Sequence, residues 1–356
     1  MGLADLGTSL VRRLPAEEAH LATIRALKLG LGAPLSAPED DPILKTTLPI
    51  SGLVLPNPIG LAAGFDKNAE VFGPMFRFGF GAVECGTVTP RAQAGNPKPR
   101  LFRLKEDKAV INRMGFNNQG LALYVRRLRR GGQRAGALGA NVGANKTSSD
   151  RISDYVTGLE AVWPYCDYVT INISSPNTPG LRGLQDKGAL EELLGRCAEV
   201  AGPLSPKRPV FLKVAPDLEE VAISDIVAVA RSAKPFLTGL IVSNTTVSRP
   251  ASLQSIHKDQ TGGLSGAPLC TLSTNILAAF ADQIGGEFDL IGVGGIATAQ
   301  DAYEKILAGA SAVQLYSALA FVGPGLVVRL KAELAKLLRA DGFSDVREAV
   351  GKAQRG

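Results

Sequence analysis

The polar segment Asn172-Ile-Ser-Ser-Pro-Asn-Thr178 has residue types that suit ligand binding or catalysis. It directly follows residues 168–171, an apolar, β-branched run that is typical of a short buried strand. Pro176 ends such a strand and favours an extended or turn conformation at Ser175. With two amides, three hydroxyls and no charge, the segment suits a polar planar ligand better than a metal ion or a phosphate. The alternative is a Ser/Asn turn whose side chains satisfy their own backbone.

Two lysines and several asparagines recur in comparable positions. Lys67 ends the segment 62–67, and Lys213 lies inside the apolar run 210–214. Because an unpaired buried ammonium is costly, these lysines indicate a Schiff base, a phosphate contact or stabilisation of negative charge on a cofactor. Amide side chains match both the donors and the acceptors of a planar ureide or a flavin ring. Those at strand ends or in loops are Asn112, Asn141, Asn172, Asn177 and Asn244.

From residue 43 onwards, short apolar runs alternate with amphipathic helical stretches, as in a succession of βα units. The eight runs are 59–63, 82–87, 137–141, 168–171, 210–214, 239–243, 290–293 and 312–315. The clearest helices are expected at 186–200, 218–232, 270–282, 299–308 (with Thr298 as N-cap) and 325–338. This alternation predicts an α/β fold, a (β/α)8 TIM barrel, in which the C-terminal strand ends form the active site. An open doubly wound sheet is the rival, but no G-x-G-x-x-G motif follows the first strand.

Glycine-rich loops follow the last two predicted strands. The segments are 292–296 and 314–317, and residues 262–266 form a further glycine-rich loop that could add a backbone donor. Glycines allow backbone N–H groups to approach an anion, and barrels often bind phosphate at these two loops. The position of the loops therefore predicts a phosphate-bearing ligand.

Residues 1–32 have the pattern of two short amphipathic helices separated by Pro15. Neither approaches the ~20 apolar residues that span a bilayer. The hairpin could pack on the main domain or lie in a membrane interface. The expected organisation is a helical hairpin and linker at 1–42, a catalytic barrel at 43–340 and a C-terminal tail at 341–356.

Composition narrows the functional classes. A chain of 356 residues with 45% hydrophobic and 20% charged residues is typical of a globular protein with a large core. The four cysteines lack CxxC spacing, which argues against a disulfide framework or a zinc site, and no metal site is expected. A Ser-His-Asp triad would have to use His20 or His257, because the chain has only these two histidines.

The net charge of +6 is concentrated locally. Residues 91–134 carry twelve basic and two acidic side chains. No aromatic-interleaved patch or reader motif for nucleic acid accompanies them. Nucleic acid is one explanation of this charge, and attraction to anionic lipid or to an anionic substrate, or a solvated helix face, explains it at least as well.

Eight motifs, taken together and in order, resemble those of the dihydroorotate dehydrogenase family. They are AAGFDKN (62–68), NRMGFNN (112–118), NISSPNT (172–178), KVAPDL (213–218), SNTT (243–246), GGLSG (262–266), GVGGI (292–296) and QLYSAL (314–319). The resemblance extends over about residues 43–340. Serine at position 175, where the soluble class carries cysteine, and the N-terminal helical extension resemble the membrane-associated, quinone-dependent class (class 2). Ser243 departs from the usual threonine but retains the hydroxyl.

The resemblance implies an FMN-dependent oxidoreductase of de novo pyrimidine (UMP) biosynthesis, which oxidises dihydroorotate to orotate and reduces a quinone (ubiquinone or menaquinone). Ser175 would be the catalytic base that takes the C5 proton. FMN would contact Ala63, Gly64, Lys67, Thr87, Asn141, Asn172, Lys213, Ser243, Gly266, Gly295, Tyr316 and Ser317. Dihydroorotate would contact Lys67, Asn112, Arg113, Met114, Gly115, Phe116, Asn172, Asn177, Asn244 and Thr245.

The same class implies peripheral attachment to the cytoplasmic face of the inner membrane through the N-terminal helices. The quinone would enter there, with its head near Arg103 and Tyr316, and no nucleic-acid partner is expected. Two rival hypotheses remain. One is a Schiff-base aldolase that uses Lys213, and the other is a non-catalytic basic protein that binds nucleic acid or lipid through residues 91–134.

Overall fold

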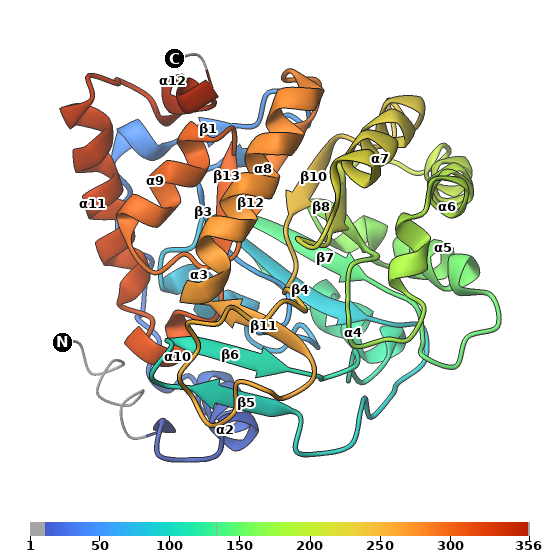
Figure 1. Cartoon of the computed structure of the whole chain (residues 1–356), viewed down its shortest axis with the longest axis horizontal. Coiled ribbons are helices and arrows are strands. Elements are labelled where there is room, and N and C mark those ends of the chain that lie inside the picture. The colour runs from blue at the N-terminus through green and yellow to red at the C-terminus, as the bar shows by residue number, and fades with distance from the viewer. Residues whose placement is uncertain (1–10, 133, 355–356) are drawn as a thin grey trace.

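The computed structural model describes residues 11–132 and 134–354 (Figure 1). Of the two predicted N-terminal helices, the second is confirmed as α2 (Ala16–Lys28). Most of the first predicted helix lies outside the described residues.

Eight parallel strands form a closed barrel, which confirms the predicted fold class and excludes the open doubly wound sheet. All eight predicted runs are strands, and Val313 pairs with Ile59 to close the barrel between the last strand and the first. The strands are β3 (Ile59–Leu61), β4 (Ala82–Val88), β7 (Ala137–Val142), β8 (Tyr168–Asn172), β9 (Val210–Val214), β10 (Gly239–Val242), β12 (Asp289–Val293) and β13 (Ala312–Leu315).

Helices cover the outside of the barrel (Figure 1). They are α3 (Phe72–Arg77), α4 (Leu121–Arg129), α5 (Arg151–Val162), α6 (Lys187–Ala201), α7 (Glu220–Ser232), α8 (Cys270–Ile284), α9 (Ala299–Leu307) and α11 (Leu326–Ala340). The predicted cap of α9 is confirmed, because Thr298 Oγ1 accepts from Asp301 N at 3.2 Å. The Asp301 carboxylate in turn accepts from Thr298 N at 2.8 Å, which completes a capping box.

Apolar side chains close the N-terminal end of the barrel. A short hairpin of β1 (Thr46–Thr47) and β2 (Val54–Leu55) packs Leu48 and Leu55 against Tyr168 and Phe211 inside the barrel. The polar residues at the C-terminal strand ends therefore face a cavity that is closed at the N-terminal end of the barrel.

A second, antiparallel sheet was not predicted. It consists of β5 (Leu101–Leu104), β6 (Ala109–Asn112) and β11 (Gly263–Gly266), with β6 in the centre. The segment 263–266, which was predicted to be a loop, is therefore a strand. This sheet has its own small core, which includes Phe102, Ile111 and Leu264.

Ion pairs and apolar contacts hold α2 and the following linker on the barrel. Glu17 pairs with Arg100 at 2.8 Å and Lys28 with Glu70 at 2.7 Å, while Ile24 and Leu27 are buried in the main core. In the linker, Asp40 pairs with Lys331 and Asp41 with Arg339. Within the predicted tail, Val346–Ala349 forms a further short helix, α12. No helix in the described part of the chain is long and apolar enough to cross a membrane.

Candidate active site

A cavity of about 550 Å³ extends from the C-terminal strand ends to the space between α2 and α10 (Leu319–Val322). It brings together nearly all the residues that the sequence predicted for the site. The lining includes Ala63, Gly64, Lys67, Thr87, Asn112, Met114, Gly115, Phe116, Asn172, Ser175, Asn177, Lys213, Ser243, Asn244, Thr245, Gly266, Gly295, Tyr316 and Ser317.

Two predicted site residues do not line the cavity. Arg113 directs its guanidinium towards Gln260 at 2.9 Å and over the ring of Phe102. Asn141 is buried inside the barrel and does not line the cavity. Its side-chain amide donates to Glu84 Oε1 at 2.7 Å and accepts from Thr87 Oγ1 at 2.5 Å. Asn141 therefore supports a lining residue rather than facing the cavity itself.

The loop after β8 presents Ser175 to the cavity. Its Oγ accepts a hydrogen bond from Asn177 N at 3.3 Å, which leaves its own proton available to a ligand. The neighbouring Ser174 is turned away from the cavity and bonds Asn172 Oδ1 and Asn244 Nδ2 at 3.0 and 2.9 Å. In the described part of the chain, the buried Thr178 Oγ1 has no hydrogen-bond partner.

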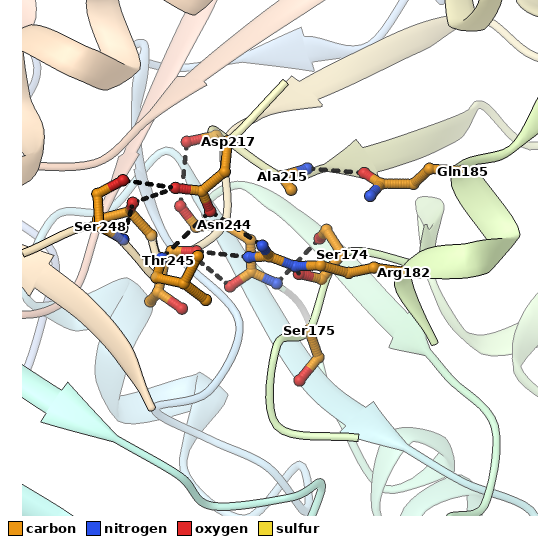
Figure 2. Close-up of polar contacts among 12 residues, drawn as sticks. Ser174, Ser175, Arg182, Gln185, Ala215, Asp217, Asn244, Thr245 and Ser248 are labelled. Carbon is orange, nitrogen blue, oxygen red and sulfur yellow. Dashed lines mark hydrogen bonds and ion pairs between the residues drawn. The ribbon is translucent and has the colours of Figure 1, made fainter. Parts of the chain in front are cut away.

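Arg182 ties together the loops that follow β8, β9 and β10 (Figure 2). Its guanidinium donates to Ser174 O at 3.1 Å and to Thr245 O at 3.0 Å, and it pairs with Asp217 at 2.9 Å. The Asp217 carboxylate also accepts from Val247 N at 3.2 Å. Ser175 lies just outside this network, so its backbone is anchored while its hydroxyl remains uncommitted (Figure 2).

Sequence reasoning missed Arg182 and Asp217. The available signal was their position, because they are opposite charges that closely follow two neighbouring strands. The ends of such strands converge in a barrel, so their loops are expected to meet.

Two lysines supply positive charge at the base of the cavity. Lys213 is buried in β9, and burial lowers its pKa while the negative charge of Glu84 opposes this shift. No hydrogen-bond acceptor for its ammonium occurs among the described residues, so the group is available to a ligand. Lys67 donates to Gly64 O at 2.7 Å. Burial lowers the pKa of Lys67 to about 8, and the charge of Arg100 adds to the shift, whereas Glu17 and Asp66 oppose it.

The loop after β12 has the conformation of an anion cradle. Gly294 and Gly295 have φ values of 119° and 78°, which residues other than glycine rarely adopt. A Cβ at Gly295 would lie 2.4 Å from Cys270 Cα, so glycine is also required for the loop to rest on the start of α8. Nearby, the hydroxyls of Ser265 and Ser317 lie 2.7 Å apart. Together, these features fit the anionic end of an elongated ligand whose polar ring lies between Lys213 and the amides.

The mouth of the cavity, which is the part lined by α2, is more apolar than the part at the strand ends. Ala19, Thr23 and Leu27 of α2 face it. His20, to which the sequence assigned no role, packs edge-on against Phe65 and beside Tyr316, with its Nδ1 3.4 Å from the Tyr316 hydroxyl. Burial, with a contribution from Lys67, lowers the pKa of His20 to about 3, so its ring is neutral near pH 7. Arg103 lines the mouth and donates to Arg12 O at 2.7 Å.

The fold and site are those of a barrel enzyme whose strand ends offer contacts for a polar, anion-bearing ligand and whose cavity has a more apolar mouth. Residues 43–338 match the family model for dihydroorotate dehydrogenase. The chain therefore belongs to the dihydroorotate dehydrogenase family and is an oxidoreductase, as the sequence motifs predicted.

Individual relatives agree over nearly the whole chain. The chain is 54% identical to a dihydroorotate dehydrogenase (quinone) of Xanthobacter autotrophicus, with 99% of each chain covered. It is 52% identical to the enzyme of the same name from Novosphingobium aromaticivorans, over 96% of this chain and 97% of that one. Among solved structures, the DHODH of Eimeria tenella in complex with ferulenol superposes with a TM-score of 0.91 at 39% identity, covering 96% of each chain.

Proposed function

We propose that this chain oxidises dihydroorotate to orotate with FMN as cofactor and a quinone as final electron acceptor, as a step of de novo pyrimidine (UMP) biosynthesis. The observation that carries the proposal is a single cavity with two chemically distinct ends. Its deep end is lined by lysines, amides and glycine loops, and its mouth by apolar residues of α2. The names of the relatives, which specify a quinone, support the same reading.

The deep end supplies contacts that suit FMN. Ala63, Gly64 and Thr87 would line the ring with Asn172 and Ser243, and Asn141 would hold Thr87 in place. Gly266, Gly295, Tyr316 and Ser317 would hold the phosphate end. When bound, FMN accepts the hydride from the substrate and passes electrons on to the quinone. The ammonium of Lys213, for which the described residues provide no partner, would stabilise negative charge beside the ring.

The substrate would lie between the cofactor and the loop after β8. Lys67 would pair with the substrate carboxylate. Amides of Asn112, Asn177 and Asn244, together with Thr245, would bond the ureide edge, and Asn177 Nδ2 already donates to Asn112 Oδ1 at 3.2 Å. This arrangement would fix which substrate carbon faces Ser175.

Ser175 would act as the base that removes the C5 proton. A serine hydroxyl is a weak base, and no histidine lines the deep end in the described part of the chain to activate it. Proton removal is therefore expected to be coupled to loss of hydride from C6. The buried hydroxyl of Thr178, which has no hydrogen-bond partner among the residues that the structure describes, or a water molecule would receive the proton next.

The mouth would admit the quinone from a membrane surface. Arg103, Tyr316 and His20 would lie near the quinone head, and α2 would face the tail. Exposed leucines continue the apolar surface on α2 and in the residues that flank it, namely Leu14, Leu21, Leu29, Leu31 and Leu35. Such a surface favours peripheral insertion into the interface of a bilayer, here proposed as the cytoplasmic face of the inner membrane.

A visible spectrum with anaerobic reduction tests the proposal directly. The purified protein should be yellow, lose its colour when dihydroorotate is added without oxygen, and recover it when a quinone follows. A yellow protein that dihydroorotate does not bleach would remove the substrate from the proposal. A protein that stays colourless even after FMN is added would remove the cofactor, and borohydride trapping on Lys213 would then test the Schiff-base alternative.

A further inference from the structure

Two buried lysines outside the cavity have opposite surroundings. Lys331 of α11 forms an ion pair with Asp40 of the linker. Lys305 of α9 is fully buried, yet within the described part of the chain its ammonium donates only to two hydroxyls, Ser273 Oγ at 2.7 Å and Thr274 Oγ1 at 2.8 Å. No carboxylate of the described residues lies within ion-pair distance of it. An ammonium buried without a counter-charge is costly, so Lys305 requires an explanation that Lys331 does not.

The carboxylate groups nearest to Lys305 are committed elsewhere. Asp301 accepts hydrogen bonds from Ala297 N at 2.9 Å and from Thr298 N at 2.8 Å, as part of the cap of α9. Glu304 accepts from Gln300 at 3.0 Å. Burial lowers the pKa of Lys305 to about 8, although its neighbours Cys270, Asp301 and Glu304 oppose the shift. The surroundings of Lys305 therefore leave its charge incompletely compensated.

Lys305 is connected to the glycine loop after β12 through one hydroxyl. Ser273 Oγ accepts from the lysine and lies 3.0 Å from both Gly294 O and Cys270 O, so its one proton is shared between the loop and the start of α8. The loop rests closely on this hydroxyl, because a Cβ at Gly294 would lie 2.9 Å from Ser273 Oγ. The aliphatic part of Lys305 packs against the end of β12 that leads into this loop, with its Cδ 3.2 Å from the position of a Cβ at Gly292. Gly294 and Gly295 line the cavity whereas Lys305 does not, so the loop lies between the ammonium and any ligand.

We propose that Lys305 is a positioning residue that makes the loop 292–296 selective for a ligand ending in a phosphate monoester. Its ammonium orients the Ser273 hydroxyl and thereby fixes Gly294. Its positive charge attracts the ligand's anion on the cavity side of the loop, because glycines have no side chains that would increase the distance between the two charges. The inference rests on the proposed function, in which this anion is the phosphate of FMN. It adds a residue that touches neither cofactor nor substrate.

Comparison of FMN with riboflavin, which lacks the phosphate, isolates this role. The full-length chain, freed of flavin, would be titrated with each, and binding followed by quenching of flavin fluorescence. The test variants are Lys305→Gln, which retains a hydrogen-bond donor without the charge, and Lys305→Met, which retains neither. The matched control is Lys331→Met, which removes a buried lysine that has its own carboxylate.

The expected result is a change in the ratio of the two affinities. Lys305→Gln and Lys305→Met should weaken FMN binding about tenfold or more, equivalent to about 1.4 kcal/mol, and leave riboflavin binding nearly unchanged. Lys331→Met should leave the ratio as in the parent chain, while its unfolding temperature falls because Asp40 loses its partner. If either Lys305 variant does not fold, Ser273→Ala should reduce the same ratio, because it breaks the link between the lysine and the loop.

Two outcomes would overturn the inference in distinguishable ways. If the Lys305 variants weaken both flavins equally, or neither, the lysine has only a structural role while the cofactor assignment stands. If the parent chain itself binds FMN no better than riboflavin, or binds neither, the assignment of the phosphate site fails and this inference fails with it.

Discussion

The two ends of the cavity are built by different principles. At the deep end, each important side chain occupies a strand end or an adjoining loop, and a network of hydrogen bonds and ion pairs through Arg182 and Asp217 fixes those loops relative to one another. At the mouth, α2 lies across the barrel on apolar contacts and a small number of ion pairs, of which Glu17–Arg100 is the least exposed. The difference indicates that the deep end is preorganised for chemistry, whereas the mouth provides a passage.

The largest expected effect lies at the deep end. Ser175→Ala should bind FMN and orotate normally but reduce the flavin about 10²–10⁴-fold more slowly, because the group that accepts the proton is lost. Stopped-flow absorbance of the bound flavin after mixing with dihydroorotate measures this rate. Ser174→Ala is the matched control: its hydroxyl is turned away from the cavity, so its effect should fall mainly on KM. Reduction of the Ser175 variant at the parent rate would show that another group is the base.

The sequence predicted the deep end far better than the mouth, for a physical reason. A barrel strand leaves a local signature of a few β-branched residues followed by a polar turn, and barrel geometry then brings the strand ends together. All eight strands and most lining residues could therefore be placed without a structure. The same rule could not show that the side chain of Asn141 stays out of the cavity, because a position on a strand does not determine how far along the barrel interior its side chain lies.

What the sequence did not predict depends on contacts between distant segments. Strand β11 pairs with β6 across about 150 residues, so 263–266 had only the local pattern of a glycine loop. Lys305 lies in an amphipathic helix, where a lysine is expected to face solvent, and only the packing of α9 against α8 shows that it is buried. His20 carried no motif, and its contact with Tyr316 spans most of the chain.

A substitution at the mouth should slow quinone turnover without affecting flavin reduction at the deep end. Thr23→Trp places a bulky ring where α2 lines the cavity. Turnover with a quinone that has a long isoprenoid tail is expected to fall by about tenfold or more, because the ring fills space that the tail needs, whereas flavin reduction by dihydroorotate should not change. Steady-state quinone reduction and single-turnover flavin reduction give the two readouts.

The control for this variant is Arg25→Trp on the exposed side of the same helix, which should change neither rate greatly. These substitutions are cleaner than removal of residues 1–42, because deletion would leave the buried guanidinium of Arg100 without Glu17. If Thr23→Trp slowed both half-reactions equally, the mouth and the deep end would not be functionally separate.

The smallest effect tests whether the two ends are electrostatically coupled. Lys67 at the deep end has a pKa lowered to about 8, chiefly by burial, and Glu17 of α2 is the largest influence that raises it. In the proposed function the substrate carboxylate pairs with the protonated lysine, so KM for dihydroorotate should rise as pH increases through 8, by about tenfold per unit at most. The sign for stability is opposite: the folded-state pKa lies below that of the unfolded chain, so the folded state gains stability from this group between about pH 8 and 10.5.

Glu17→Gln makes the coupling measurable. It removes the charge that raises the pKa of Lys67 and leaves Arg100, which lowers it, so the rise in KM should begin at a lower pH. The measurement is KM as a function of pH for the parent chain, for this variant and for Lys67→Met. In Lys67→Met, KM should be high and should no longer rise through pH 8. An unchanged midpoint in Glu17→Gln would mean that α2 contributes a wall to the cavity but no charge to its chemistry. A lower midpoint would mean that the helix at the mouth also tunes the lysine at the deep end, so that loosening α2 weakens substrate binding as well as quinone access.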